Sequence, residues 1–173
     1  MEVIENRAEW QRRFVEGWLH HYQTTGEIKW DLYNRPDNKT APAGKGVVLH
    51  QSRLVLISSA GGYWAPQQAA FDAENDLGDY TIRTFPVSTP PEQIAFAHTH
   101  YDHTAVNDDQ QVLLPLGHLQ DLVSEGAIGE LAPQVISFMG YQPDAGQVVD
   151  TTIPAILTAT KEMNATAALL VPS

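Results

Sequence analysis

Three of the seven histidines of the chain and one aspartate fall within six consecutive positions, His98–His103. In an extended strand every second side chain points to the same side, so His98 and His100 would face the same way, and a turn after them would bring His103 round. Neutral imidazoles that converge at the end of a strand suit Zn or Fe(II). Asp102 could orient a ring N–H or bind the metal itself. We therefore predict catalytic residues His98, His100, Asp102 and His103, with His98, His100 and His103 as candidate metal ligands.

The pattern H-x-H-x-D-H of this segment also resembles that of the metallo-β-lactamase superfamily. That superfamily needs further ligands well downstream, including another histidine, and its fold needs two sheets and a longer chain. After His103 this chain has only His118, which lies in an apolar segment that predicts a helix. A motif without its structural context carries little weight, so we set this superfamily aside.

The alternative to a functional site is a hydrogen-bonded polar loop that ties one strand to the next element. An isolated histidine would favour that interpretation. Four side chains of ligand type together favour function, because the ligand sites of open α/β sheets lie at the carboxyl ends of the strands. Both interpretations are open from the sequence alone.

Two further segments carry candidate substrate-binding residues. The first is Gly61-Gly62-Tyr63, where successive glycine N–H groups could bind a substrate carboxylate, although a simple tight turn explains the same residues. The second contains Asn107, which belongs to a turn or capping sequence and lies close to the histidines. We therefore predict substrate-binding roles for Gly61, Gly62, Tyr63 and Asn107.

Apolar periodicity divides the chain into alternating strands and helices. Strands are predicted at residues 52–59, 80–87, 94–98, 112–114, 134–139 and 167–171, and helices at residues 4–24, 116–124 and 150–162. The first strand is apolar and rich in branched side chains, which is typical of a strand buried on both faces. The first helix has an aromatic residue at every fourth position, namely Trp10, Phe14, Trp18 and Tyr22. Residues 30–46 and 65–79 are predicted to be loops.

This order of elements predicts the α/β class, with a mostly parallel twisted sheet and flanking helices in a single Rossmann-like domain. We expect residues 1–46 to form an N-terminal helix and surface loop that pack on the domain. Residues 47–173 are expected to form the α/β domain itself. A length of 173 residues is ordinary for one domain with its own core.

Composition excludes several classes of function. The chain has 10 lysine and arginine residues against 21 acidic ones, a net charge of −11, which argues against nucleic acid or an anionic membrane as partner. It has no cysteine, which excludes disulfide bonds, thiolate metal sites and a cysteine nucleophile within these residues. No apolar run approaches ~18 residues, and the charged N-terminal segment lacks the apolar core of a signal peptide. We therefore expect a cytoplasmic protein without a membrane partner.

Several segments, taken in order, resemble the selenoprotein B family, which includes the B component of glycine, sarcosine and betaine reductases and the small subunit of D-proline reductase. They are Ser52–Ile57 with Gly61-Gly62, then His98–His103, Leu113–Leu116, Glu125–Pro133 and Ile136–Tyr141. The likeness spans residues 52–173, and earlier residues match only loosely. The resemblance implies an oxidoreductase in which a selenocysteine, in a Sec-x-x-Cys or similar motif, cleaves a C–N bond of an amine or amino-acid substrate.

The family's selenocysteine motif should begin directly after Ser173, where the sequence ends. The resemblance then implies that the histidines and Asp102 line a pocket beside that residue and donate a proton to the leaving amine or hold a metal. Two explanations are open: a UGA codon after Ser173 read as stop, or a naturally short protein that has lost its redox centre. We expect the first, and an α/β domain truncated at its carboxyl end, because a chain that stopped on a buried strand would leave apolar surface uncovered.

Reductases of this family have several subunits, so we expect partner subunits, an oligomer and a small amine or amino acid as substrate. Without the selenocysteine motif, the chain is expected to be inactive as a reductase. Two other functions stay open. A metal-dependent hydrolase or lyase that uses the histidines alone predicts stoichiometric metal, whereas a non-catalytic subunit predicts an empty histidine site and a stable complex with another protein.

Overall fold

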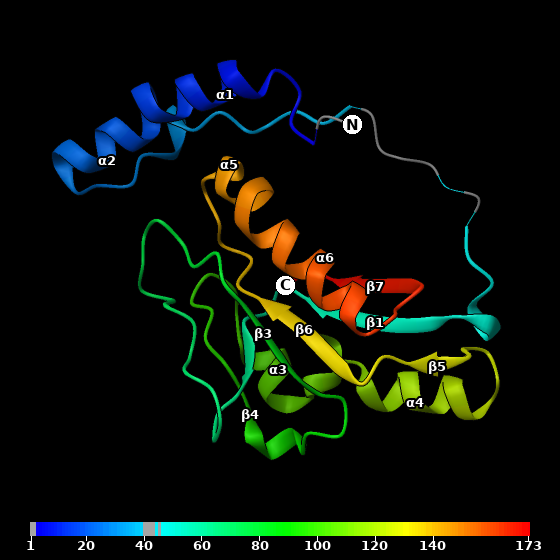
Figure 1. The fold of residues 1–173 in the computed structure, drawn as a ribbon. Helices are drawn as coiled ribbons and strands as arrows, with labels where there is room; N and C mark the ends of the chain where they lie inside the picture. The colour runs from blue at the N-terminus through cyan, green and yellow to red at the C-terminus, as the bar shows by residue number, and fades with distance from the viewer. Residues whose placement is uncertain (1–2, 40–43, 45) are drawn as a thin grey trace.

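The computed structural model describes residues 3–39, 44 and 46–173 (Figure 1). Its strands are β1 Arg53–Ser58, β2 Gly62–Trp64, β3 Ile82–Pro86, β4 Ile94–Phe96, β5 Glu130–Leu131, β6 Gln134–Phe138 and β7 Ala167–Val171. Its helices are α1 Arg7–Arg13, α2 His20–Thr25, α3 Thr104–Asp108, α4 Leu116–Ser124, α5 Ala145–Gln147 and α6 Ile153–Glu162. π-Helical stretches, Phe14–Leu19 and Val148–Thr152, join α1 to α2 and α5 to α6. Single 3-10 turns lie at Trp30–Leu32, Leu49–Gln51, Pro91–Gln93 and Gln110–Val112.

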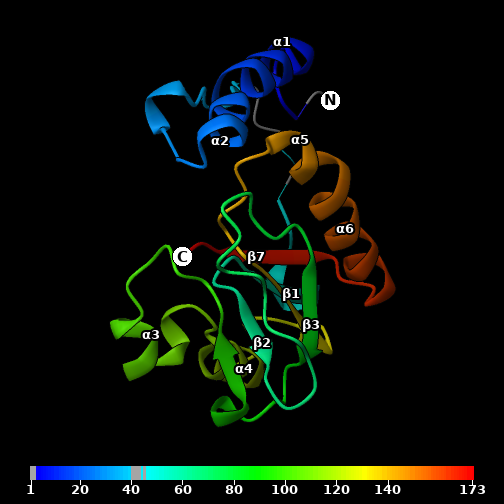
Figure 2. The same ribbon diagram turned by 90° about the vertical axis from the view of Figure 1, so that its left-hand side faces the viewer.

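The strands form a main sheet in the order β3, β6, β1, β7, with the short β5 beside the start of β1. β1 runs parallel to β5, β6 and β7, and β3 runs antiparallel to β6. β2 and β4 form a separate antiparallel pair. Figures 1 and 2 show α6 on one face of the main sheet and α4 with the β2–β4 pair on the other. The structure thus confirms the α/β class with a mostly parallel sheet and flanking helices, and the Rossmann-like description stays a prediction.

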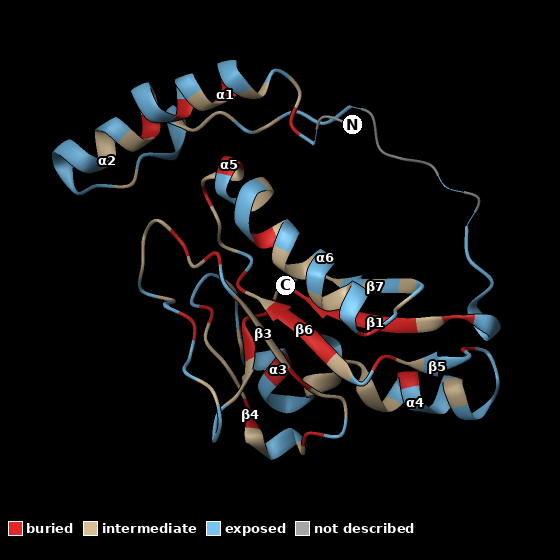
Figure 3. Cartoon of the chain, in the orientation of Figure 1, coloured by how far each residue is buried: buried red, intermediate tan, exposed pale blue. Residues whose placement is uncertain are grey.

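β1 is buried on both faces, as its uninterrupted apolar sequence predicts. Leu54 and Leu56 pack into the core on the side of α4, whereas Val55 and Ile57 pack on the side of α6. Figure 3 shows β1 and β6 as the buried centre of the sheet. Burial of apolar surface stabilises the folded state by roughly 25 cal/mol per Å². Because β1 buries apolar side chains on both faces, it holds the elements that pack on either side of it in place.

The N-terminal helix presents its aromatic face to the rest of the chain. Trp10, Phe14 and Trp18 are buried and stack in series, with ring centroids 5.2 and 5.5 Å apart. The hydroxyl of Tyr33 donates a hydrogen bond of 2.8 Å to the carbonyl of Pro143, which lies just before α5. The predicted amphipathic helix at residues 4–24 is therefore confirmed, although it begins at Arg7 and includes a π-helical stretch.

The strand predicted at residues 112–114 is wrong. Gln110–Val112 is a 3-10 turn, because the side chain of Asp109 accepts a hydrogen bond from the backbone N–H of Gln111 and fixes that turn. Leu114 is buried in the core as part of the loop that leads to α4. The apolar character that suggested a strand reflects this burial.

Other boundaries differ by a few residues. The helix predicted at 150–162 already begins at Ala145. The side chain of Asp144 accepts hydrogen bonds from the backbone N–H groups of Gly146 and Gln147 and so caps the start of this helix. β2 and β5 were not predicted, because segments this short carry no periodic signal. Residues 65–79 form a loop as predicted, and of the loop predicted at 30–46, residues 40–43 and 45 lie outside the described residues. No helix in the described part of the chain is long and apolar enough to cross a membrane.

Candidate functional site

The histidine segment is a compact loop rather than an extended strand. β4 ends at Phe96, so the expected alternation of His98 and His100 on one side of a strand is wrong. Nδ1 of His98 instead accepts a hydrogen bond of 3.2 Å from the backbone N–H of His100. The Nε2–H of His103 donates a hydrogen bond to the carbonyl of His98, at 2.5 Å. These two contacts fold the loop back on itself and fix the position of the His98 ring.

Asp102 lies two residues before the short helix α3. Its Oδ1 accepts hydrogen bonds from the backbone N–H and the hydroxyl of Thr104, at 2.9 and 2.7 Å. These hydrogen bonds lower the pKa of Asp102, so the carboxylate is ionised at neutral pH. In this structure Asp102 ties the end of the histidine loop to Thr104, the first residue of α3.

His98 is buried and neutral. Only 5% of the residue is exposed, and burial together with the charges of His100 and His103 lowers its pKa to about 4. Because Nδ1 accepts a hydrogen bond, the remaining proton lies on Nε2. A Cβ atom on Gly140 would lie 3.3 Å from that Nε2, so the backbone of residue 140 comes unusually close to the imidazole. His98 is thus a neutral hydrogen-bond donor at neutral pH.

A cavity of about 680 Å³ lies beside this ring at the carboxyl ends of three parallel strands. β1 contributes Ile57 with the following Ser59, β6 contributes Phe138 and Gly140, and β7 contributes Leu170 to Ser173. His98, His100 and Tyr141 complete the lining. Open α/β sheets bind their ligands at this edge, and the volume is that of a small-molecule pocket. We call this cavity the histidine pocket.

His100 and Tyr141 form one wall of the histidine pocket. Their rings stack with centroids 3.8 Å apart and planes 4° apart. The Tyr141 hydroxyl donates to the carbonyl of Asp76 at 3.0 Å, and burial raises the pKa of Tyr141 to about 12, so this donor keeps its proton. Ser59 and Ser173, which also line the pocket, contact each other, and the backbone N–H of Ser173 donates to the Ser59 hydroxyl at 2.9 Å. The pocket therefore has one aromatic wall and one hydroxyl wall.

The structure brings some of the predicted residues together and separates others. His98 and His100 line the histidine pocket, whereas Asp102 and His103 hold the loop in shape. Within the described ranges, no three histidine or acidic side chains are grouped so that they could hold a metal ion. The expected ligand set His98, His100 and His103 is therefore not arranged for a metal, and we derive no step through one.

The predicted substrate-binding residues lie outside this lining. The N–H of Gly61 donates to the carbonyl of Phe138 at 2.9 Å, and Gly62 and Tyr63 belong to β2. Asn107 lies on α3 and lines a different cavity. Sequence reasoning missed Ser59, Tyr141 and Ser173 as pocket residues. Each lies at or just after the carboxyl end of a predicted strand, so the carboxyl-edge rule would have pointed to them.

Fold and site together define an α/β domain with a small-molecule pocket at the carboxyl edge of its sheet. A family model described as glycine/sarcosine/betaine reductase selenoprotein B matches residues 33–170. The D-proline reductase subunit gamma of Acetoanaerobium sticklandii is 33% identical over 122 residues, which cover 70% of this chain and 49% of that relative. The chain therefore belongs to the glycine/sarcosine/betaine reductase selenoprotein B family, as the resemblance of its segments predicted.

The chain spans about half the length of the curated relative that it matches. No solved structure shows a significant match to it. The shared segments of the family therefore show the relationship, and the pocket has to be interpreted from its own geometry.

Proposed function

We propose that this chain is the part of a selenoprotein B-type reductase subunit that binds an amino acid or amine and supports reductive cleavage of its C–N bond. Family membership and the name of the D-proline reductase relative support this function. The observation that carries the proposal is the convergence of His98, His100 and Ser173 on one cavity. Ser173 is distant from the two histidines in the sequence, so a polar loop with no other role would not require them to meet.

The histidine pocket suits a small zwitterion. The Nε2–H of His98 is a neutral donor that can bind a substrate carboxylate without becoming charged. Phe138 and Leu170 supply apolar contact for the carbon skeleton. Substrate orientation would follow from these two contacts.

A selenolate delivered beside Ser173 would attack the carbon that bears the amine, so that a C–Se bond forms as the C–N bond breaks. A thiol would then act as the reductant and release the carbon by forming an Se–S bond. His100 is exposed and lies in the pocket wall, so it is the residue that would donate a proton to the leaving amine. Tyr141 holds the His100 ring in place by stacking. In this proposal His98 binds, His100 moves a proton, and Tyr141 orients His100.

We also propose that partner subunits complete the enzyme, in line with the name of the relative, which is itself that of a subunit. β7 is the last strand of the main sheet, and its Leu170 is 67% exposed beside the histidine pocket. Exposed apolar surface next to a functional site is typical of an interface. A partner that covers β7 would also close the pocket against water.

The proposal is tested with the complete reductase, assembled with its partner subunits and supplied with D-proline, glycine, sarcosine or betaine. Replacing His100 by Gln should lower kcat at least about 100-fold, since a positioned acid typically contributes 10²–10⁴-fold. His118→Gln, on the exposed side of α4, is the matched control and should leave kcat unchanged. Equal activity of the wild type and H100Q would refute the proton-donor role. Failure of all four substrates to bind at the pocket would refute the function.

Binding is measured separately with the purified 173-residue chain. Titration with D-proline, followed by the imidazole NMR signals of His98 and His100, should shift those signals and leave the signal of His118 in place. His98→Phe keeps the volume and removes the donor, and it should weaken binding about 10-fold. An equal affinity in this variant would exclude the carboxylate contact.

A further inference from the structure

The imidazole of His98 presents a free donor to the histidine pocket. His98 is 5% exposed and lines the pocket, and its Nε2 makes no hydrogen bond with the residues that the structure describes. Most buried polar groups in folded proteins are paired, so this N–H is available to an acceptor that enters the pocket. The direction of the N–H depends on the rotation of the His98 ring, which neighbouring side chains must hold.

Tyr101 packs directly against that ring. The rings of Tyr101 and His98 have centroids 5.0 Å apart and planes 70° apart, which is the edge-to-face arrangement that aromatic rings favour. The ring of Tyr101 also stacks on that of His103, with centroids 4.4 Å apart and planes 29° apart. The Nε2–H of His103 in turn donates to the carbonyl of His98. Tyr101 therefore contacts His98 directly and also packs on a second side chain that holds it.

Tyr101 is itself tied to the backbone that follows β1. Its hydroxyl donates a hydrogen bond of 3.2 Å to the carbonyl of Ala60, which is fully buried. Burial raises the pKa of Tyr101 to about 12, so the hydroxyl keeps the proton that it donates. Ala60 directly precedes Gly61, where a Cβ would lie 3.1 Å from Cβ of His98. Tyr101 thus fixes the histidine loop at the place where this backbone passes closest to His98.

We propose that Tyr101 is a positioning residue that keeps the Nε2–H of His98 directed into the histidine pocket. Tyr101 is not among the described residues that line the pocket, so it acts on a ligand through His98. Its hydroxyl fixes the tyrosine ring, and the tyrosine ring fixes the rotation of the imidazole. The proposal rests on the proposed function in one respect, namely that His98 binds the carboxylate of the substrate.

The first test is spectroscopic and needs no substrate. NMR of the purified 173-residue chain at neutral pH reports the protonation of both ring nitrogens of His98. In the wild type Nδ1 should be bare and Nε2 protonated, with slow exchange of that proton because the ring is buried. Tyr101→Leu removes the ring contacts and the hydroxyl, so both tautomers should appear and the proton should exchange at least about 10-fold faster. Wild-type His98 signals in this variant would overturn the proposal.

The second test measures binding of D-proline to the same chain by calorimetry. Tyr101→Leu should weaken binding about 10-fold. Tyr101→Phe keeps both ring contacts and loses only the hydrogen bond to Ala60, so it should weaken binding about 2-fold and keep the wild-type tautomer of His98. Equal affinity of the wild type and Tyr101→Leu would refute the positioning role. If the wild type failed to bind D-proline but the NMR result held, the proposed function would fail and the positioning of His98 by Tyr101 would stand.

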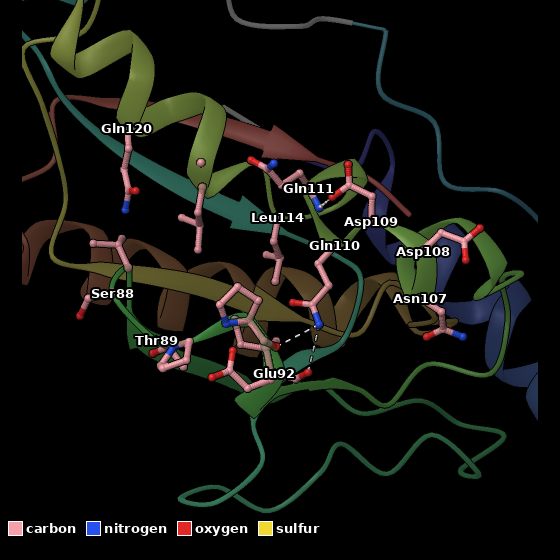
Figure 4. A pocket seen from close by; sticks show the side chains of 16 residues that line it. Ser88, Thr89, Glu92, Asn107, Asp108, Asp109, Gln110, Gln111, Leu114 and Gln120 are labelled. Carbon is pink, nitrogen blue, oxygen red and sulfur yellow. Dashed lines mark hydrogen bonds between the residues drawn. The ribbon is translucent and has the colours of Figure 1, made fainter.

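A control variant separates positioning from a general loss of stability. A second cavity, of about 560 Å³, shares none of its described lining residues with the histidine pocket, and Leu114 forms part of its wall (Figure 4). Leu114 is 3% exposed, so Leu114→Ala should destabilise the fold at least as much as Tyr101→Leu, which urea unfolding measures. Leu114→Ala should leave the His98 signals and the affinity for D-proline unchanged. If it disturbed His98 as much as Tyr101→Leu does, the effect of Tyr101 would be one of stability alone and the proposal would be wrong.

Discussion

Gly61 lies directly behind the histidine loop, and its replacement by alanine should destabilise the protein by roughly 1.5–4.5 kcal/mol, the sum of a conformational cost and an overpacking cost. Its φ is +68°, and a Cβ there would lie 2.8 Å from the carbonyl oxygen of Ala97 and 3.1 Å from Cβ of His98. The left-handed conformation alone costs alanine about 1–2 kcal/mol, of which about 0.4–1 kcal/mol is offset by the lower entropy of the unfolded chain. Pressing a Cβ against a fixed backbone adds about 1–3 kcal/mol.

Gly126 supplies the matched control. Its φ is +74°, yet a Cβ there would meet nothing within 4 Å among the described residues. Gly126→Ala should therefore cost only the conformational part, roughly 0.5–1.5 kcal/mol. Urea unfolding of both variants, with equal m values, measures the difference. If G61A cost no more than G126A, the close approach of Gly61 to the histidine loop would be refuted.

Three further predictions concern the core and the histidines. Because His98 has a pKa of about 4, well below that of an unfolded histidine, the unfolded state binds more protons between about pH 4 and 6.5, and stability should fall as the pH drops through that window. Urea unfolding of the wild type and of His98→Phe at several pH values measures this dependence. If the free energy of unfolding changed equally with pH in both proteins, a neutral His98 would be contradicted. Val55→Ala should lower the free energy of unfolding by about 2–3 kcal/mol, because Val55 is fully buried. Leu157→Ala, at a residue that is 50% exposed, should lower it by well under half as much. Similar losses of stability in the two variants would refute a core on both faces of the sheet. Zinc added to the purified chain should leave its thermal stability unchanged, because the imidazoles are not grouped for a metal, and a rise in Tm with stoichiometric binding would speak against that geometry.

The main sheet could be predicted from the sequence because its strands carry their own signal. The apolar run at residues 52–59 can only be buried on both faces, and the structure has β1 there. β2 and β5 have three and two residues, and their pairing depends on neighbours that are distant in the sequence. The segment at 112–114 was wrongly predicted to be a strand. A short loop with a buried residue such as Leu114 and a short strand show the same apolar residues in the sequence.

The histidine pocket was predictable only in part. The cluster of imidazoles and the carboxyl-edge rule together pointed to the right end of the sheet. The hydrogen bond from the His100 N–H to His98 could not be predicted, because it depends on where β4 ends. The stacking of Tyr141 on His100 joins two loops from different strands, and no spacing within the sequence encodes such a contact.

The aromatic wall of the histidine pocket continues into the N-terminal segment. The ring of Trp30 lies edge-on to that of Tyr141, 6.1 Å between centroids, and Trp30 in turn contacts the buried ring of Trp18 at 5.6 Å. Trp18 and Trp30 precede residue 33, where the match to the family model begins. A segment outside the match to the family model therefore supports a ring that lines the histidine pocket. The indole emission of Trp30 therefore offers an optical probe for following occupancy of the pocket from outside it.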